Sequence, residues 1–98
     1  MAQVTFFENR TTNGTSSEVL GTALTGGFCV MKFTGTFDGA IIKVMMDFND
    51  SDYAPLDALE IDEACCRAVK MPAGTRITVE LSNAQPTTDI TVKGTRSE

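Results

Sequence analysis

The sequence predicts an all-β protein, namely a small antiparallel β-sandwich or barrel of about seven strands with an extended N-terminal arm. Apolar and polar residues alternate in several short runs, as they do in strands with one buried face. The pair Asp38-Gly39 lies between two such runs, and this dipeptide favours a tight turn between strands. Turn-forming residues recur about every ten residues, which is typical of sandwiches and small barrels.

Length and composition fit a single domain. The chain has 98 residues, of which 42% are hydrophobic, and a chain of this size can bury roughly two thirds of its unfolded surface around one core. We expect residues 1–17 to form an N-terminal arm with a short strand, and residues 18–98 to form a single β-sandwich domain.

The N-terminal segment begins with a β-prone run over residues 3–8, and residues 9–17 have the polar composition of a loop or extended arm. Neighbouring side chains on a strand face opposite ways, so the pair Phe6-Phe7 leaves two alternatives open. Either both rings are covered within the fold, or the arm reaches onto a neighbouring subunit. The predicted partner-binding residues lie in this segment: Phe6, Phe7, Asn9 and Arg10.

The turn at Asp38-Gly39 is predicted to close a hairpin, because Gly adopts positive φ without a clash of its side chain. The run before the turn places these apolar residues on one face: Cys29, Met31, Phe33 and Phe37. The run after the turn places these inward: Ile42, Val44, Met46 and Phe48. Lys43, Met45 and Asp47 are expected to point outward.

Further strands are predicted over residues 18–24, 57–62, 64–71, 75–81 and 88–93, followed by a polar tail over 94–98. The run 64–71 also fits a helical turn. A strand is favoured because Pro72-Ala73-Gly74 forms a tight turn that would join two antiparallel strands. The run 75–81 alternates most clearly, with Ile77, Val79 and Leu81 inward and Arg76, Thr78 and Glu80 outward.

The charge balance argues against a nucleic-acid partner. The formal net charge is −5, and the eight Lys and Arg residues are scattered, whereas phosphate contacts need grouped basic side chains. No apolar run approaches the roughly 20 residues that span a bilayer, and the first residues lack the pattern of a signal peptide. We therefore expect no membrane contact and synthesis in cytosol-like surroundings.

The three cysteines are expected to be reduced. Cys65 and Cys66 are adjacent, so on a strand they point to opposite faces and cannot easily be bridged to each other. Cys29 lies in an apolar strand, where a thiol behaves as a small hydrophobic group. Without His or a Cys-x-x-Cys pair, a structural zinc site is not expected.

No catalytic, cofactor-binding or metal-binding residue is predicted, and we expect that the chain is not an enzyme. The absence of His removes the usual Ser-His-Asp and Cys-His arrangements. The neighbouring carboxylates are Asp50 with Asp52, and Glu60 with Asp62 and Glu63. All are expected on polar loops or wet strand faces, where solvated carboxylates make poor general acids at neutral pH.

One spacing resembles a calcium loop. Asp47, Asn49 and Ser51 match the first three ligand positions, at which alternate oxygen donors converge on the ion. However, Asp52 stands where the loop needs Gly, and Ala58 stands where it needs a bidentate Glu. A solvated turn is therefore predicted.

From Phe33 onward, the order of motifs resembles a small β-domain that recurs in bacteriophage virion proteins, among capsid decoration and head-fibre proteins and tail or neck accessories. The motifs are a Gly-Thr-Phe-x-Gly-Ala hairpin, a hydrophobic strand, an Asp/Gly-rich turn with an aromatic residue, a less regular strand, a Pro-x-Gly turn before an Arg-containing strand, and a Thr-Val strand. They lie here at residues 35–40, 41–48, 49–53, 56–71, 72–76 and 91–92. The likeness covers residues 28–94, and Tyr53 stands where Trp is often seen.

This resemblance implies a bacteriophage virion structural protein, first of all a capsid decoration (cement) protein on the outer capsid surface, synthesised in the host cytoplasm. The implied partners are the major capsid protein and further copies of the chain, as in a homotrimer. Attachment would use many weak contacts, with about 800 Å² from each subunit in a stable interface. One alternative is a head-tail connector, tail or fibre component. Another is a glycan or host-surface binding module, for which a single Tyr and no Trp offer little stacking surface.

Overall fold

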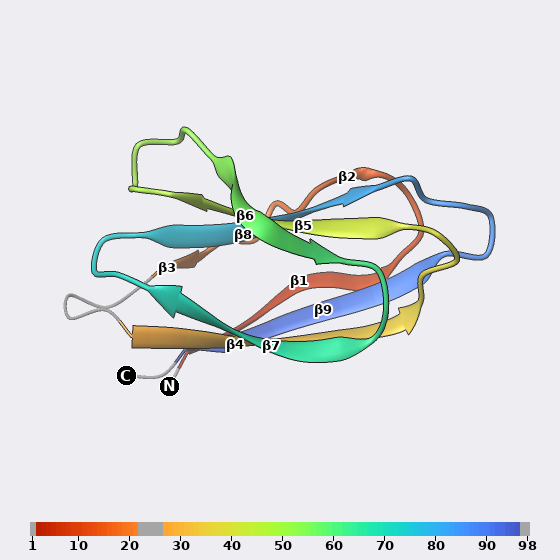
Figure 1. Cartoon of the computed structure of the whole chain (residues 1–98), viewed down its shortest axis with the longest axis horizontal. Helices are drawn as coiled ribbons and strands as arrows, with labels where there is room; N and C mark the ends of the chain where they lie inside the picture. The colour runs from red at the N-terminus through yellow and green to blue at the C-terminus, as the bar shows by residue number, and fades with distance from the viewer. Residues whose placement is uncertain (1, 22–26, 97–98) are drawn as a thin grey trace.

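The structure is a computed structural model that describes residues 2–21 and 27–96, and it forms two antiparallel sheets packed face to face (Figure 1). The strands are β1 (Ala2–Arg10), β2 (Gly14–Thr15), β3 (Leu20–Gly21), β4 (Gly27–Thr36), β5 (Ile41–Asp47), β6 (Ala54–Ile61), β7 (Cys65–Met71), β8 (Arg76–Ser82) and β9 (Asp89–Arg96). One sheet has four strands in the order β1-β9-β4-β7. The other has five, in the order β2-β8-β5-β6 with β3 also paired to β8. The predicted all-β sandwich is confirmed.

The core lies between the two sheets and consists of the inward side chains of both. Its largest fully buried side chains are Phe33, Leu20, Met31, Ile42, Ile61, Met71, Ile77, Leu81, Ile90, Val44, Val79 and Val92. The inward residues predicted for the runs 28–37 and 75–81 are all buried. The strand predicted over 64–71 is also confirmed as β7. No described segment forms a helix that is long and apolar enough to cross a membrane.

The turn at Asp38-Gly39 joins the two sheets, so the predicted hairpin is wrong. The turn itself forms: both residues have positive φ, 50° and 86°, and the Ala40 amide donates to the Phe37 carbonyl oxygen at 2.9 Å. However, β4 lies inside the four-stranded sheet and β5 inside the five-stranded sheet. The alternation of apolar and polar residues shows which face of a strand is buried. The same alternation is found in two strands that pair side by side in one sheet and in two strands that stack across a core.

The turn at residues 72–74 also connects the sheets, because β7 belongs to one and β8 to the other. The Thr75 amide donates to the Pro72 carbonyl oxygen at 3.2 Å, and Gly74 has a φ of 83°. The predicted tight turn is confirmed. The two strands that it joins stack across the core instead of pairing, as at Asp38-Gly39.

β1 pairs with β9 along one edge of the four-stranded sheet, so residues 2–10 lie within the sandwich. Thr5 is opposite Lys93 and Phe7 is opposite Val92, so Phe6 is an extra residue in a β-bulge. Strict alternation is interrupted there, and both rings face the core, with Phe6 5% and Phe7 4% exposed. Of the two alternatives for this pair, the structure has both rings covered within the fold.

The end of β5 departs from the predicted alternation. Asp47, expected outward, is 2% exposed, whereas Phe48, expected inward, is 77% exposed. The strand ends at Asp47, and the following loop folds back so that the Ser51 amide donates to Asp47 Oδ2 at 2.9 Å. Asn49 and Ser51 both have a φ of 65°, which breaks the extended backbone beyond the strand.

Other boundaries differ from prediction by a few residues. Of the run 18–24, residues 20–21 form β3, and residues 22–24 lie outside the described residues. Thr78, expected outward, is buried because its hydroxyl contacts the segment between β2 and β3, donating to the Glu18 carbonyl oxygen at 3.1 Å. β9 continues to Arg96, beyond the predicted start of the tail at residue 94, and residues 97–98 lie outside the described residues.

Candidate interaction surface

Two of the four predicted partner-binding residues lie in the core. The Phe6 and Phe7 side chains are buried between the sheets, so their surface is not available to a partner. The bulge in β1 is the physical reason, because it directs both adjacent rings inward. Asn9 is exposed, with a φ of 51°, and its amide donates to Thr91 Oγ1 at 3.1 Å.

Arg10 is half-buried and folds back onto its own chain. Its Nε donates to the Thr12 carbonyl oxygen at 2.7 Å, and its Nη2 donates to the Asn13 carbonyl oxygen at 3.0 Å. The guanidinium carbon lies 5.2 Å from the centre of the Phe7 ring. Arg10 therefore stabilises the connection from β1 to β2. Of the four predicted residues, Asn9 is the one whose side chain is exposed.

The residues with calcium-loop spacing are arranged around an ion pair. Arg76 donates Nε to Asp47 Oδ1 at 3.0 Å and Nη2 to Oδ2. The hydrogen bond from Arg76 is the main reason that the pKa of Asp47 lies below its ordinary value. The Asp47 oxygens are thus directed at a guanidinium in a half-buried ion pair, whereas residues 48–52 of the predicted solvated turn are exposed. In the described residues, no group of three His, Cys, Asp or Glu side chains converges as metal ligands would.

Tyr53 covers the same ion pair. Its ring centre lies 5.7 Å from the Arg76 guanidinium carbon, and its hydroxyl is buried without a hydrogen-bond partner. Burial, with the nearby Asp47 carboxylate, raises the pKa of Tyr53. The single Tyr is therefore used inside the fold, and its ring offers no open platform for a sugar.

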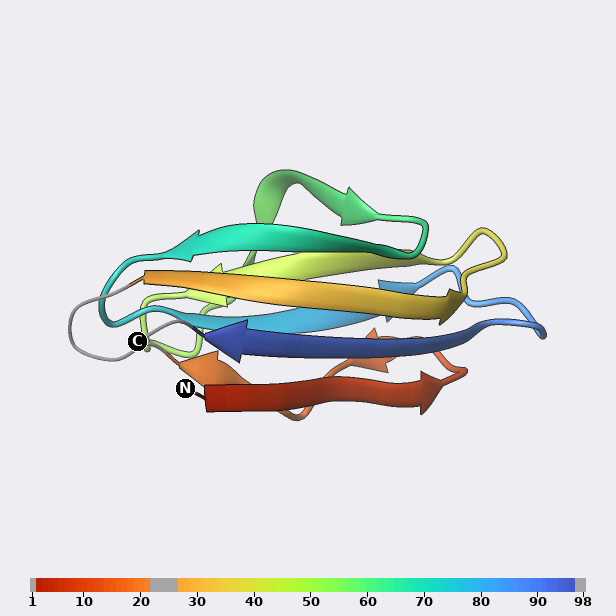
Figure 2. The same ribbon diagram turned by 90° about the horizontal axis from the view of Figure 1, so that it is seen from below.

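β4 is an interior strand of the four-stranded sheet, between β7 and β9 (Figure 2), and its outward side chains include exposed apolar residues. Phe28 is 53% exposed and Val30 is 51% exposed, both on β4. The neighbouring outward residues of β7 are exposed as well, and so is Lys93 on β9. We name this surface the outer β4 face, defined by Phe28, Val30, Lys32, Cys66, Ala68, Lys70 and Lys93.

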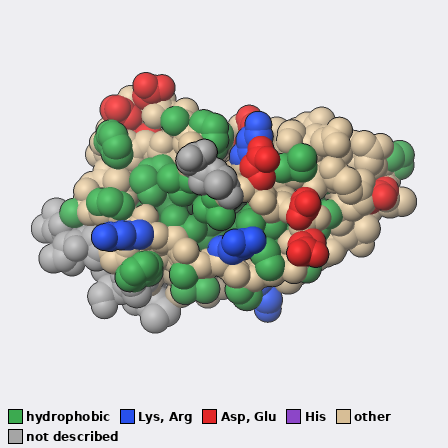
Figure 3. Space-filling model, viewed as in Figure 1, with side chains coloured by type: hydrophobic (Ala, Val, Ile, Leu, Met, Phe, Trp, Pro, Cys, Tyr) green, Lys and Arg blue, Asp and Glu red, His purple; other side chains and the backbone are tan. Residues whose placement is uncertain are grey.

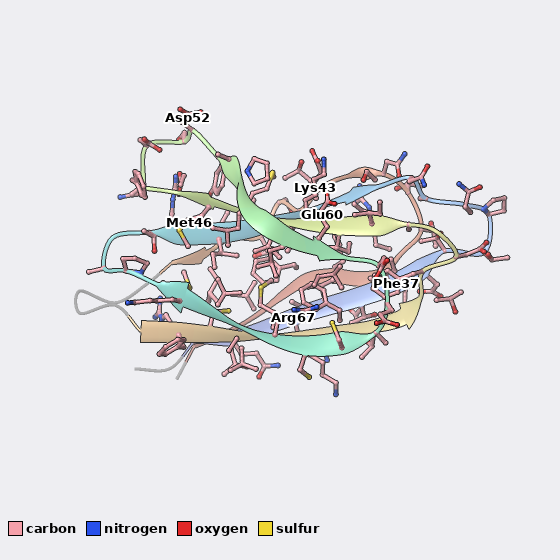
Figure 4. The ribbon with its side chains drawn as sticks, in the orientation of Figure 1. Phe37, Lys43, Met46, Asp52, Glu60 and Arg67 are labelled. Atoms are coloured by element: carbon pink, nitrogen blue, oxygen red, sulfur yellow. The ribbon has the colours of Figure 1, made fainter. Side chains whose placement is uncertain are left out.

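A second apolar surface lies on the side of the sandwich where β6 and β7 meet. Figure 3 shows hydrophobic side chains gathered there, with acidic and basic side chains around them. The partly buried apolar residues of β5, β6 and β7 that pack against the core are Met46, Leu56, Leu59 and Cys65. Figure 4 shows Lys43 beside Glu60 on this side, with Arg67 on β7. This surface continues the core, so its apolar residues already have packing partners.

The outer β4 face is the stronger candidate because its apolar residues point away from the core. The alternation that places Cys29, Met31 and Phe33 inward also places Phe28 and Val30 outward, so the signal for this face was present in the sequence. Comparison of the chain with family models, with curated proteins and with solved structures found no significant match.

Proposed function

We propose that this chain is a virion structural protein of a bacteriophage, and specifically a capsid decoration protein that binds the lattice of the major capsid protein through its outer β4 face. Two observations support the proposal. One is the order of motifs over residues 28–94, which resembles virion accessory domains. The other is the pair Phe28 and Val30, exposed on an interior strand of the four-stranded sheet.

The exposed pair on β4 is the observation that carries the proposal. An apolar patch rimmed by polar side chains on a soluble domain marks a contact with another macromolecule. Here the polar side chains around the pair include Lys32, Lys70 and Lys93, and the β4 backbone is hydrogen-bonded on both sides, to β7 and to β9. The patch is therefore presented by a rigid support.

The geometry suits attachment by area rather than by a deep pocket. A flat sheet face can contribute the about 800 Å² per partner that a stable interface buries. Each copy would bind the capsid lattice weakly. Copies joined in a trimer, or arranged on a repeating lattice, would bind at several sites at once and therefore dissociate slowly. A rigid sandwich loses little conformational entropy when it docks, because its backbone is already ordered.

Purified particles of the phage that encodes the chain would test the proposal. We expect cryo-electron microscopy to place the protein on the outer shell, with a copy number that scales with that of the major capsid protein. A single ring of copies at the neck or along the tail would contradict the decoration role and favour the connector or tail alternative.

A binding assay would test the surface. We expect Val30→Asp to abolish co-sedimentation with shells that lack the protein, because a charge would be buried in the apolar contact. Ala54→Asp is the matched control, since it adds the same charge to an exposed strand residue of the opposite sheet. Circular dichroism should show both variants folded. Equal binding by both would rule out the outer β4 face as the contact.

A further inference from the structure

We infer that the outer β4 face binds a protein surface that presents carboxylates around an apolar contact, and that Lys32 and Lys93 together receive one of those carboxylates. The inference rests on the proposed function in one respect, namely that the outer β4 face is a contact surface. It adds the chemistry of the partner, which nothing in the proposed role specifies.

The outward side chains of β7, β4 and β9 form three rows across the sheet. From β7 toward β9 the rows are Lys70 and Phe28, then Ala68, Val30 and Thr95, then Cys66, Lys32 and Lys93. The apolar row therefore lies between two rows that carry positive charge. No acidic residue belongs to these rows. The face is cationic, although the chain as a whole has a net charge of −5.

Lys32 and Lys93 lie directly opposite each other on neighbouring strands, and both are exposed. Like charges at such positions destabilise a sheet. The next residue across the sheet, opposite Lys93 on β1, is Thr5, which carries no charge. The ion pair recorded among the described residues joins Arg76 to Asp47, and neither lysine takes part in it.

The five-stranded sheet also has a lysine on an interior strand, but the cross-strand partners of that lysine are acidic. Lys43 on β5 has Glu60 as its cross-strand partner on β6 (Figure 4). Its partner on β8 is Glu80. In the five-stranded sheet the lysine thus lies between two carboxylates, whereas in the four-stranded sheet two lysines lie opposite each other. A carboxylate from a partner, placed between Lys32 and Lys93, would supply the neutralisation that the chain lacks there.

The same charges argue against two other occupants. A second copy bound symmetrically through the same face would set lysines against lysines, because a two-fold interface brings the same patch from both subunits together. A nucleic acid would contact only the three lysines of this face, on a chain of net negative charge, and it would leave the apolar row without a binding partner. A protein surface with carboxylates and apolar side chains satisfies both the charge and the apolar row.

The test uses the isolated chain and a blocked peptide of alternating Glu and Leu. We expect amide NMR shifts, on titration with this peptide, to be confined to β4, β7 and β9. Lys32→Gln and Lys93→Gln should each weaken binding by about two- to fivefold, as loss of an exposed ion pair does. Lys43→Gln is the matched control and should bind as the wild type does. A peptide of alternating Lys and Leu should not bind.

A second measurement separates binding from a structural role. Because Lys32 and Lys93 repel each other, Lys93→Gln should unfold at the same temperature as the wild type or higher, while it binds less well. Lower thermal stability in that variant would overturn the inference. So would shifts on another surface, unchanged binding by both Gln variants, or tighter binding of a short DNA duplex to the same face. Peptide binding as expected, by a protein that is absent from the outer shell, would refute the decoration role and keep the inference.

Discussion

Arg76 on β8 holds the carboxylate of Asp47 on β5 at two points, and the two residues are direct cross-strand partners at the end of the β5–β8 pair. The loop after β5 returns over this ion pair, with the Ser51 amide bonded to Asp47 and the Tyr53 ring against Arg76. One ion pair thereby anchors the β5–β6 loop to the sheet and accounts for the burial of an acidic side chain.

Asp47→Asn should lower the melting temperature at neutral pH, because Arg76 loses its charged partner. The pKa of Asp47 in the folded protein lies below its ordinary value, so the stabilisation is complete above about pH 4 and is lost as the pH falls through the folded-state pKa. The difference in melting temperature from the wild type should therefore be constant near neutrality and shrink in acid. Thermal circular dichroism across pH measures it. Asp62→Asn, at an exposed loop position, is the control, and a difference unchanged in strong acid would contradict the prediction.

Phe6→Ala and Phe7→Ala should each reduce the free energy of unfolding by about 3–5 kcal/mol, because each removes a buried ring from the core. Glu8→Ala, at an exposed site of the same strand with ordinary backbone conformation, should change it by less than about 0.5 kcal/mol. Urea titrations give all three values. Deletion of residues 1–17 removes β1, β2 and both rings, so the shortened chain should lose cooperative unfolding. A deletion variant with an intact transition would show that the segment is an arm after all.

Gly35→Ala and Gly39→Ala should differ sharply, although both glycines have positive φ. A Cβ at Gly39 meets nothing within 4 Å, so that variant bears only the strain of a φ of 86°, about 1 kcal/mol. A Cβ at Gly35 would stand 2.1 Å from the Asp89 carbonyl oxygen on β9, and we expect a loss of about 3 kcal/mol or more. Chemical denaturation compares the two. Equal losses would mean that backbone conformation alone, and not the contact with β9, requires Gly35.

The three cysteines should react with a thiol reagent at different rates. Cys66 is exposed, Cys65 is half-buried and Cys29 is buried. Burial raises the pKa of Cys29 to about 11, so its thiol stays protonated and unreactive at neutral pH. Mass spectrometry of partly labelled protein should find Cys66 modified first and Cys29 only after unfolding. In denaturant all three should react alike. Rapid labelling of Cys29 in the native protein would contradict the packing of β4.

The turns could be predicted from the sequence, but the partners of the strands could not. Asp38-Gly39 and Pro72-Ala73-Gly74 turn the chain where their residue types indicate, because the backbone preferences of Gly and Pro are local. Whether the strands then pair or stack depends on which distant strand completes each sheet. β4 takes β7 and β9 as its neighbours, and neither is adjacent to it in the sequence.

The candidate surface was only partly predictable. Alternation alone places Phe28 and Val30 outward, so these residues could have been identified from the sequence. The position of Lys93 opposite Lys32 could not, because it depends on the register between strands that are about sixty residues apart. Phe6 and Phe7 were predicted to bind a partner, whereas a bulge in β1 buries both rings. A bulge leaves no clear signal in a short run of sequence, so this burial could not be predicted.

Residues close together along the chain are enough to show that this protein is all-β, where its turns lie, and which face of most strands is buried. Contacts between distant segments are needed to show that the turns cross between sheets, that β1 belongs to the core, and that Asp47 is buried against Arg76. The physical reason is that strand pairing and register are set by contacts between distant segments, and the free energy of burying the shared core selects among the pairings that local preferences allow.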